Sequence, residues 1–402
     1  MQQTSSHRIA PILGMLGALG PLSIDMYLPG MPTIAEHLNS GEGAVQFSLV
    51  TFFAGLVIGQ LLFGPLADWL GRKRMIYAGL ALFVIGSLGC ASVSTAAQLT
   101  TWRFVQGFGG SIGMVIGFAI VRDLYTGRTA ASLIALMMIV QGLAPILAPL
   151  LGSAIISFAP WQAIFGILAV FGVLSCIVVA FWLPETRSIE QRATSRPFDA
   201  MRNYGRLLVS TNFMPYVVAT ALAQAGFFAY LGGSSFVFIS LHGLSPAAYS
   251  GVFAVNSLGL VAGSQIAARL LGRFQAETVV RAALVAYVVA AIVLVVLEAS
   301  QHSSLLLLAA LLFCVITAMS FVMSLGSVLA LEAQGAISGT ASALMGALRF
   351  GAGTLSSFAV GATANGTAMP MLSTIAICGM GACLVSFVAF PASPDGIRRE
   401  TS

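Results

Sequence analysis

Three charged side chains lie inside long apolar segments of the sequence: Asp25, Arg103 and Arg349. Ionisable groups at membrane depth are costly and usually mark a transport or proton pathway. Asp25 lies 16 residues into the first apolar segment, a helix rise of about 24 Å. The same rise places Arg103 about 28 Å from Arg122 and Arg349 about 20 Å into the eleventh segment. These depths predict that the three side chains share a central cavity.

Asp25 has the chemistry of a proton carrier. Loss of water favours the protonated form of a carboxylate, whereas a nearby guanidinium or a bound cation favours the ionised form. A cationic ligand would therefore displace the proton, which is the physical basis of antiport at one carboxylate. Alternatively, Asp25 marks a helix end near the outer interface, because Pro29 and Pro32 follow it. Arg103 has an equally good structural interpretation, bonded to backbone carbonyls, and for Arg349 a structural role is favoured.

The composition indicates that the solvent around these residues is mostly lipid. Of 402 residues, 58% are hydrophobic and only 8% are charged, whereas soluble domains carry about 25% charged residues. The mean hydropathy is +0.96. The five cysteines lie in apolar runs without paired spacing, and the four histidines fall in loops or at the terminus. The sequence therefore predicts no metal site and no disulfide.

The apolar segments are long enough to cross a bilayer, since a spanning helix needs about 20 apolar residues. We expect an all-α integral membrane protein with twelve transmembrane helices. The expected helices cover 9–29, 44–67, 75–94, 98–121, 130–156, 161–183, 213–239, 246–268, 278–297, 304–330, 336–361 and 368–390.

The basic residues give the orientation. An even number of spans puts both termini on one side, and sixteen of the 18 basic residues fall in the loops or termini of that side. The positive-inside rule makes this side cytoplasmic, so both termini are predicted to be cytoplasmic. The net charge of +5 thus reflects topology, and we expect no nucleic-acid partner.

The longest connection divides the chain into two groups of six helices. We predict an N-terminal six-helix bundle over 1–183, a cytoplasmic linker over 184–212 and a C-terminal six-helix bundle over 213–402. A weak internal sequence similarity supports duplication of a six-helix unit, because the similar stretches "LADWLGRKR" and "IAARLLGRF" follow the second and the eighth helix. Pseudo-repeated bundles imply a substrate path at their interface, near the bilayer midplane.

The stretch "QGLAPILAPLLGS" carries the strongest helix-breaking signal in the first bundle. Pro145 and Pro149 lie four residues apart and share a helix face, and each removes a backbone donor. Gly142 and Gly152 permit close approach to a neighbouring helix. These four residues are a candidate hinge where the two bundles seal, although this stretch alone favours ordinary membrane-helix packing, in which proline and glycine are common.

Several motifs resemble the major facilitator superfamily, which implies its fold of two six-helix bundles. "GPLADWLGRKR" is similar to the signature loop between helices two and three, with Trp69 standing where an arginine is usual. "LTTWRFVQGFGGS" looks like the fourth-helix motif. The run at 142–153 resembles the antiporter motif of the fifth helix, with Ala148 and Leu151 departing from its usual glycines.

The stretches "SIDMYLPGMP", "VRDLY", "WLPETR" and "SGTASALMGALRFGAG" together resemble the bicyclomycin- and chloramphenicol-resistance (Bcr/CflA) branch of drug:proton antiporters. That resemblance implies proton and substrate binding at Asp25 and proton coupling through Arg103. It also implies a cytoplasmic charge latch that holds the outward-open state, made by Asp68, Gly71, Arg72 and Asp123.

Candidate substrate-cavity residues flank Asp25 or lie on the seventh helix, the pseudo-repeat partner of the first. Aromatic and methionine surfaces suit varied, partly apolar ligands. We therefore expect the cavity to include Met26, Tyr27, Phe227, Phe228, Tyr230 and Arg349.

These observations predict proton-coupled efflux of small amphipathic drugs across the bacterial inner membrane by alternating access. The expected protein is a monomer driven by the proton motive force, with no cofactor. Its expected partners are a small drug or metabolite, protons and the lipid bilayer. One alternative is a proton symporter that imports a metabolite. Another is a membrane-embedded enzyme, but no catalytic cluster is evident at membrane depth.

Overall fold

The computed structural model describes residues 6–194, 197–302, 304–332 and 334–390. Arg196, Arg398 and Arg399, which the orientation argument uses, lie outside the described residues, as do the outermost ends of the two predicted bundles. Every described secondary-structure element is helical. Within these residues, twelve helices are long and apolar enough to cross a membrane.

The first six spans begin with Ile9–His37, which is divided into three consecutive helices. Their bounds are α1 (Ser6–Asp25), η1 (Leu28–Gly30), α2 (Met31–His37), α3 (Glu42–Leu70), α4 (Arg72–Ala91), α5 (Ala96–Leu124), α6 (Gly127–Phe158) and α7 (Gln162–Trp182).

The last six spans begin with α10, which continues into the π-helical segment η2. Their bounds are α10 (Met214–Ser235), η2 (Phe236–Leu241), α11 (Pro246–Leu270), α12 (Ala276–Ala299), α13 (Leu305–Glu332), η3 (Gly335–Ile337), α14 (Ser338–Ala362) and α15 (Met369–Ala389). Apart from the first span, the expected bounds agree with the observed ones to within three residues.

The first span differs from the prediction, because it continues to His37 instead of ending near residue 29. Pro29 and Pro32 have no backbone N–H, so the carbonyl groups of Asp25 and Leu28 lose their helical donors four residues later. The helix is therefore interrupted after Asp25, tightens into η1 and resumes as α2. The two prolines mark a break within the span and not its end.

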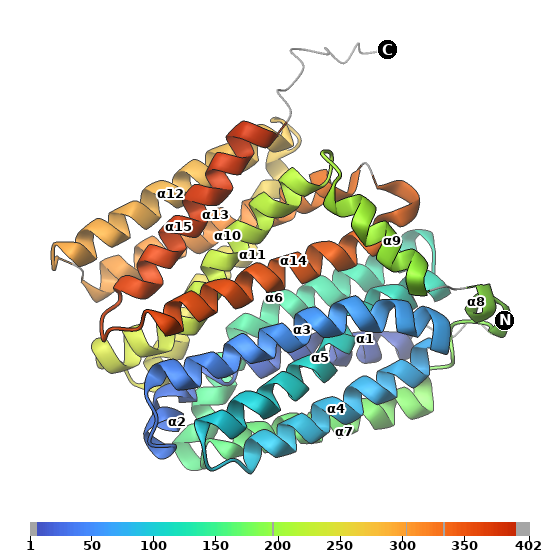
Figure 1. Ribbon diagram of the computed structural model, residues 1–402, viewed down its shortest axis with the longest axis horizontal. Helices are drawn as coiled ribbons and strands as arrows, with labels where there is room; N and C mark the ends of the chain where they lie inside the picture. The colour runs from blue at the N-terminus through green and yellow to red at the C-terminus, as the bar shows by residue number, and fades with distance from the viewer. Residues whose placement is uncertain (1–5, 195–196, 303, 333, 391–402) are drawn as a thin grey trace.

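The first and the last six spans pack against each other mainly through two helix pairs. One is α3 with α14, which lie side by side in Figure 1, and the other is α6 with α11. We call the end that carries Arg72–Arg74 the basic end and the other the far end. At the far end, the Glu42 carboxylate accepts a hydrogen bond from Ser240 at 2.9 Å, and the rings of Phe47 and Phe358 lie 5.9 Å apart.

Glycines allow α5 to approach its neighbours at backbone distance. A side chain at Gly107 would overlap the carbonyl of Phe52 in α3, and one at Gly113 would overlap the carbonyl of Leu16 in α1. Such small-residue contacts are typical of helix pairs in membranes, where packing and not water expulsion holds helices together. They fix the position of Arg103, which α5 carries.

The predicted linker contains two further helices, α8 (Ile189–Thr194) and α9 (Pro197–Leu208). Helix α9 contacts both α3 and α14, and Figure 1 shows it crossing the direction of the spans. The linker therefore contains a helix that packs on both groups of spans.

Candidate functional site

Asp25 is the last residue of α1 and lies at the interruption of the first span. It is only 4% exposed and is the one buried acid among the described residues. Twelve residues of the same span follow it, up to His37, which corresponds to about 18 Å of helix. This depth does not fit the alternative that Asp25 marks a helix end at the outer interface.

The last six spans present polar groups toward Asp25. Its carboxylate interacts electrostatically with the hydroxyl groups of Tyr230 in α10 and Tyr249 in α11. Asn256 donates a hydrogen bond to the Tyr230 hydroxyl at 3.0 Å. The Tyr249 hydroxyl shares a 2.8 Å hydrogen bond with Ser234. The break in the first span also contacts these helices, since η1 packs on both α10 and α11.

Arg103 is fully buried within the first six spans. It donates to the Ser23 carbonyl at 3.0 Å and to Gln106 at 2.6 Å. Its guanidinium carbon lies 4.2 Å from the ring centre of Phe52 and 4.7 Å from that of Tyr27. The guanidinium Nε and Nη2 have no hydrogen-bond partner among the described residues. The faces of the Phe52 and Tyr27 rings attract the guanidinium charge and so compensate part of the cost of these missing hydrogen bonds.

These contacts of Arg103 differ from the expectation that it shares a central cavity with Asp25. Among the described side chains, the ion pairs do not include one between these two residues. The two residues are connected through Ser23, whose carbonyl accepts a hydrogen bond from Arg103 and which lies two residues before Asp25. Arg103 therefore holds the end of α1 through the Ser23 carbonyl.

Arg349 lies among the last six spans. It donates hydrogen bonds to Ser327 of α13 at 2.8 Å and to Thr220 of α10 at 3.4 Å. These are the partners that the sequence did not identify. The arginine is partly exposed, and it joins three helices of one group.

The candidate cavity residues separate into two environments. Tyr27 is fully buried, shares a 2.8 Å hydrogen bond with Ser48 and covers Arg103, so it belongs to the packing of the first six spans. Phe228 instead contacts the opposite group, with its ring 4.5 Å from that of Phe53 in α3.

The other candidates follow the same division. Tyr230 faces Asp25, as described above, and Phe227 lies partly exposed with its ring stacked on that of Tyr230 at 6.1 Å. Met26 is buried with its carbonyl against Gly152. Asp25, Phe228 and Tyr230 thus all lie where the two groups of spans meet, Asp25 near Tyr230 and Phe228 against Phe53.

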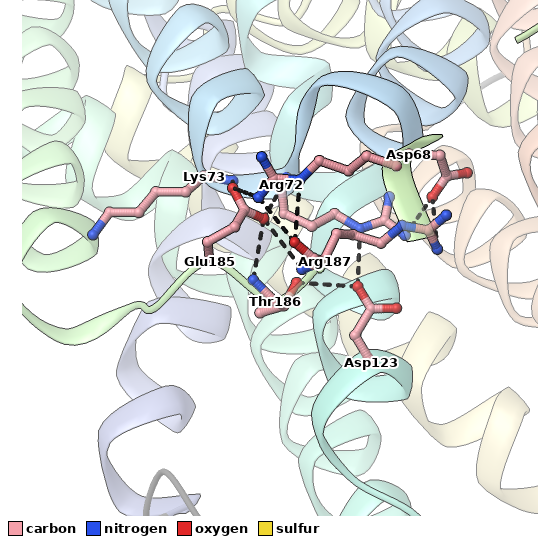
Figure 2. Close-up of polar contacts among 8 residues, drawn as sticks. Asp68, Arg72, Lys73, Asp123, Glu185, Thr186 and Arg187 are labelled. Carbon is pink, nitrogen blue, oxygen red and sulfur yellow. Dashed lines mark hydrogen bonds and ion pairs between the residues drawn. The ribbon is translucent and has the colours of Figure 1, made fainter. Parts of the chain in front are cut away.

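The residues expected to form the latch lie together at the basic end, as Figure 2 shows. Arg72 forms an ion pair with Asp68 at 2.6 Å and another with Asp123 at 3.0 Å. Gly71 interrupts the helix between Asp68 and Arg72 with a φ of +104°, a conformation that favours glycine. The pair forms although the helix is discontinuous.

Three latch residues were not predicted, although they belong to the quoted stretch "WLPETR". Glu185 accepts hydrogen bonds from the backbone N–H groups of Arg72 at 2.9 Å and Lys73 at 3.3 Å. Thr186 donates to Asp123 at 3.1 Å, and Arg187 lies 3.6 Å from Asp68. A carboxylate at a helix N-terminus is favourable because it satisfies free N–H groups and the helix dipole. The periodicity of the sequence does not predict such a contact, because its two residues are 113 positions apart.

The variant Glu185→Gln tests this cap. We expect a loss of about 1 kcal/mol in the stability of the folded protein, because the amide keeps one acceptor oxygen but loses the charge that faces α4 and Arg192. Thermal unfolding in detergent measures it. Glu332→Gln, which changes an exposed acid at the same end, is the matched control; an equal shift in both variants would argue against the cap.

The four hinge candidates lie where α6 meets α11 and α1. Pro149 has no N–H, so it leaves the Pro145 carbonyl without its helical donor. The Ser257 hydroxyl of α11 lies 3.3 Å from that carbonyl and 2.9 Å from the carbonyl of Phe253 in its own helix. The Ser250 hydroxyl lies 2.9 Å from the Pro149 carbonyl and 2.8 Å from that of Pro246, so each hydroxyl shares its one hydrogen between two acceptors. Pro149 thus frees one backbone acceptor, the Pro145 carbonyl, and serine hydroxyl groups of the last six spans lie within hydrogen-bond distance of the carbonyls of both prolines.

The double variant Ser250→Ala/Ser257→Ala tests this contact. Each interhelical hydrogen bond in a membrane contributes about 0.6 kcal/mol on average, so we expect a loss of roughly 1 kcal/mol and weaker association of α6 with α11. Cross-linking of cysteine pairs placed across the two helices measures it. Ser264→Ala is the control, because Ser264 donates to Val261 within α11; unchanged cross-linking in the double variant would show that the bonds do not hold the helices.

Comparison with known proteins agrees with this architecture. The family model described as Major Facilitator Superfamily matches residues 13–357. The D-xylose-proton symporter has a similar fold, with a TM-score of 0.73 and 15% identity, covering 96% of this chain and 98% of that one. A bacterial homologue of the lysosomal transporter Spinster, in an inward-facing and occupied conformation, has a TM-score of 0.72 and 14% identity, covering 97% of each chain.

Relatives found by sequence comparison have a higher identity to this chain than these solved structures do. An uncharacterised MFS-type transporter, YdgK of Bacillus subtilis, is 36% identical over 90% of each chain. The bicyclomycin resistance protein homologue of Haemophilus influenzae is 31% identical over 96% of this chain and 95% of its own. The multidrug resistance protein MdtL of Escherichia coli is 31% identical over 68% of each. The protein is thus a multi-pass membrane transporter of the major facilitator superfamily, in the Bcr/CflA branch.

Proposed function

We propose that the protein exports small amphipathic compounds from the bacterial cytoplasm in exchange for protons. The names of the relatives from Haemophilus influenzae and Escherichia coli support drug efflux. The observation that carries the proton coupling is the burial of Asp25 at a helix break, facing polar groups of the other six spans. The basic end is cytoplasmic in this proposal, because cytoplasmic loops of membrane proteins are enriched in lysine and arginine.

Transport occurs by alternating access, with residues 1–183 rocking against 213–402. A proton enters from the far end and neutralises the Asp25 carboxylate. A cationic compound that arrives from the basic end favours the ionised carboxylate and releases the proton toward the cytoplasm. Tyr230 and Asn256 provide the opposing surface: when the bundles approach, the tyrosine hydroxyl is placed to donate to the ionised carboxylate, which compensates its loss of water.

The ion pairs of Arg72 act as a latch at the basic end, and the α6–α11 contact seals the bundles along the membrane. Arg103 acts as a positioning residue in this scheme. It holds the Ser23 carbonyl, and therefore the end of α1, in one place while the surrounding bundles move. Its charge is stabilised by ring faces and carbonyls and does not need Asp25 as a partner.

An efflux screen in inside-out vesicles with an imposed pH gradient tests the function, beginning with amphipathic compounds that carry a cationic group. We expect compound-dependent dissipation of the proton gradient, with protons and compound moving in opposite directions. Movement in the same direction would establish the symporter alternative. Absence of proton movement with a transported compound would overturn the coupling.

A further inference from the structure

The linker helix α9 joins the two groups of spans at the basic end. It packs on α3 of the first six spans and on α14 of the last six, as the light green helix in Figure 1 shows. Leu207 is 1% exposed, so this contact is a packed one. Whatever binds the outer side of α9 therefore acts on both groups at once.

Helix α9 also covers the latch. Tyr204 is half-buried, and its hydroxyl interacts electrostatically with Asp68. Burial, with a smaller contribution from the Asp68 carboxylate, raises the pKa of Tyr204 to about 12. The tyrosine is therefore neutral at physiological pH, and α9 meets the latch without adding charge to it.

The outer side of α9 has an apolar strip next to a basic one. Met201 and Leu208 lie two turns apart on one face and are 64% and 47% exposed. Arg202 and Arg206 lie one turn apart on the adjoining face, and both are exposed. An apolar strip bordered by arginines is the pattern of a helix that lies in the membrane surface.

We propose that α9 is a binding surface for anionic phospholipids of the adjacent leaflet. The apolar strip enters the boundary of the acyl chains, and Arg202 and Arg206 bind headgroup phosphates. Charge complementarity supports this partner, because guanidinium groups match phosphate oxygens in geometry and charge. Position supports it too, because α9 packs on α3 and α14 and Tyr204 lies near Asp68, two residues before the end of α3, which is where a spanning helix reaches the membrane surface.

This binding would make the transporter sensitive to the charge of the membrane. A ligand shifts a conformational equilibrium only by its difference in affinity for the two states. Lipid bound to α9 favours the arrangement in which the helix contacts α3 and α14 together. Anionic lipid is therefore expected to stabilise that arrangement and the latch beneath it.

Hydrogen–deuterium exchange of the full-length protein in nanodiscs tests the proposal without a transported compound, so its failure is separate from failure of the proposed function. One set of discs contains phosphatidylcholine alone, and the other an equal mixture with phosphatidylglycerol. We expect backbone exchange in α9 to be roughly 25-fold slower in the anionic discs, since each of the two arginines near an anionic surface contributes on the order of a fivefold preference. High salt should abolish the difference by screening.

The double variant Arg202→Gln/Arg206→Gln should lose this difference. Arg269→Gln/Arg273→Gln is the matched control, because it removes two exposed arginines of the same end that lie outside α9, and it should keep the difference. Equal exchange of the wild type in both discs would overturn the proposal. An equal difference in both double variants would also overturn it, because general surface charge and not α9 would then bind the lipid.

Discussion

Asp25→Asn is expected to abolish proton-driven efflux while leaving the protein folded and in the membrane. Asparagine preserves the size of the side chain but cannot exchange a proton, so the variant resembles a permanently protonated carrier. Because an uncharged group is less costly than a carboxylate at this depth, folding should not suffer. Accumulation of compound in inside-out vesicles under a pH gradient measures the effect, with the amount of protein in the membrane measured in parallel.

The matched control for this variant is Glu332→Gln, which neutralises an exposed acid of the same protein and should transport normally. Neutral compounds should still bind to Asp25→Asn, because the loss concerns coupling and not the surrounding apolar surface. Full proton-driven efflux by Asp25→Asn would contradict the role proposed for this carboxylate.

Gly152→Ala is expected to have the second largest effect, on stability and transport together. A methyl group at this position would overlap the carbonyl oxygen of Met26, directly after Asp25 in the break of the first span. Overpacking a close contact costs about 1–3 kcal/mol, and backbone offers less room to adjust than a side chain does. We expect a lower temperature of unfolding in detergent, and reduced efflux because Asp25 moves with Met26.

Gly142→Ala is the control for this prediction. It lies in the same helix and the same motif, but a methyl group there would meet only the side chain of Val261 at 3.5 Å, an ordinary contact. We expect that variant to be nearly neutral. Equal destabilisation by both substitutions would show that the motif needs flexible glycines generally and not one close approach at residue 152.

The spans were predictable because lipid imposes a simple condition on sequence. A segment that crosses the membrane must satisfy its own backbone hydrogen bonds, so apolar helices of sufficient length are visible without any partner. The α10 and α11 helices begin within one residue of the expected bounds. The ion pair of Asp68 with Arg72 was accessible too, because both residues are close in sequence.

Other features depend on contacts that sequence spacing does not encode. Depth along a helix put Arg103 and Asp25 at similar levels, but depth does not determine the direction of a side chain. Gly107 and Gly113 bring α5 so close to α3 and α1 that Arg103 points into the first bundle.

The break of the first span and the linker helix were missed for different reasons. Pro29 and Pro32 signal a local interruption, but they do not tell whether the helix ends there or resumes. The packing of η1 on α10 and α11 decides between these two outcomes. Helix α9 is too short and too charged for a search based on apolar length, although its arginines were visible as topology signals.

Proton release on binding tests the central claim most directly. Purified protein in weakly buffered detergent solution, with a pH indicator, is mixed with a compound that the vesicle screen has identified as transported. The wild type should release protons on binding, and Asp25→Asn should bind the compound without releasing any. Equal release by both proteins, or binding by the wild type without release, would contradict the exchange of proton and compound at Asp25.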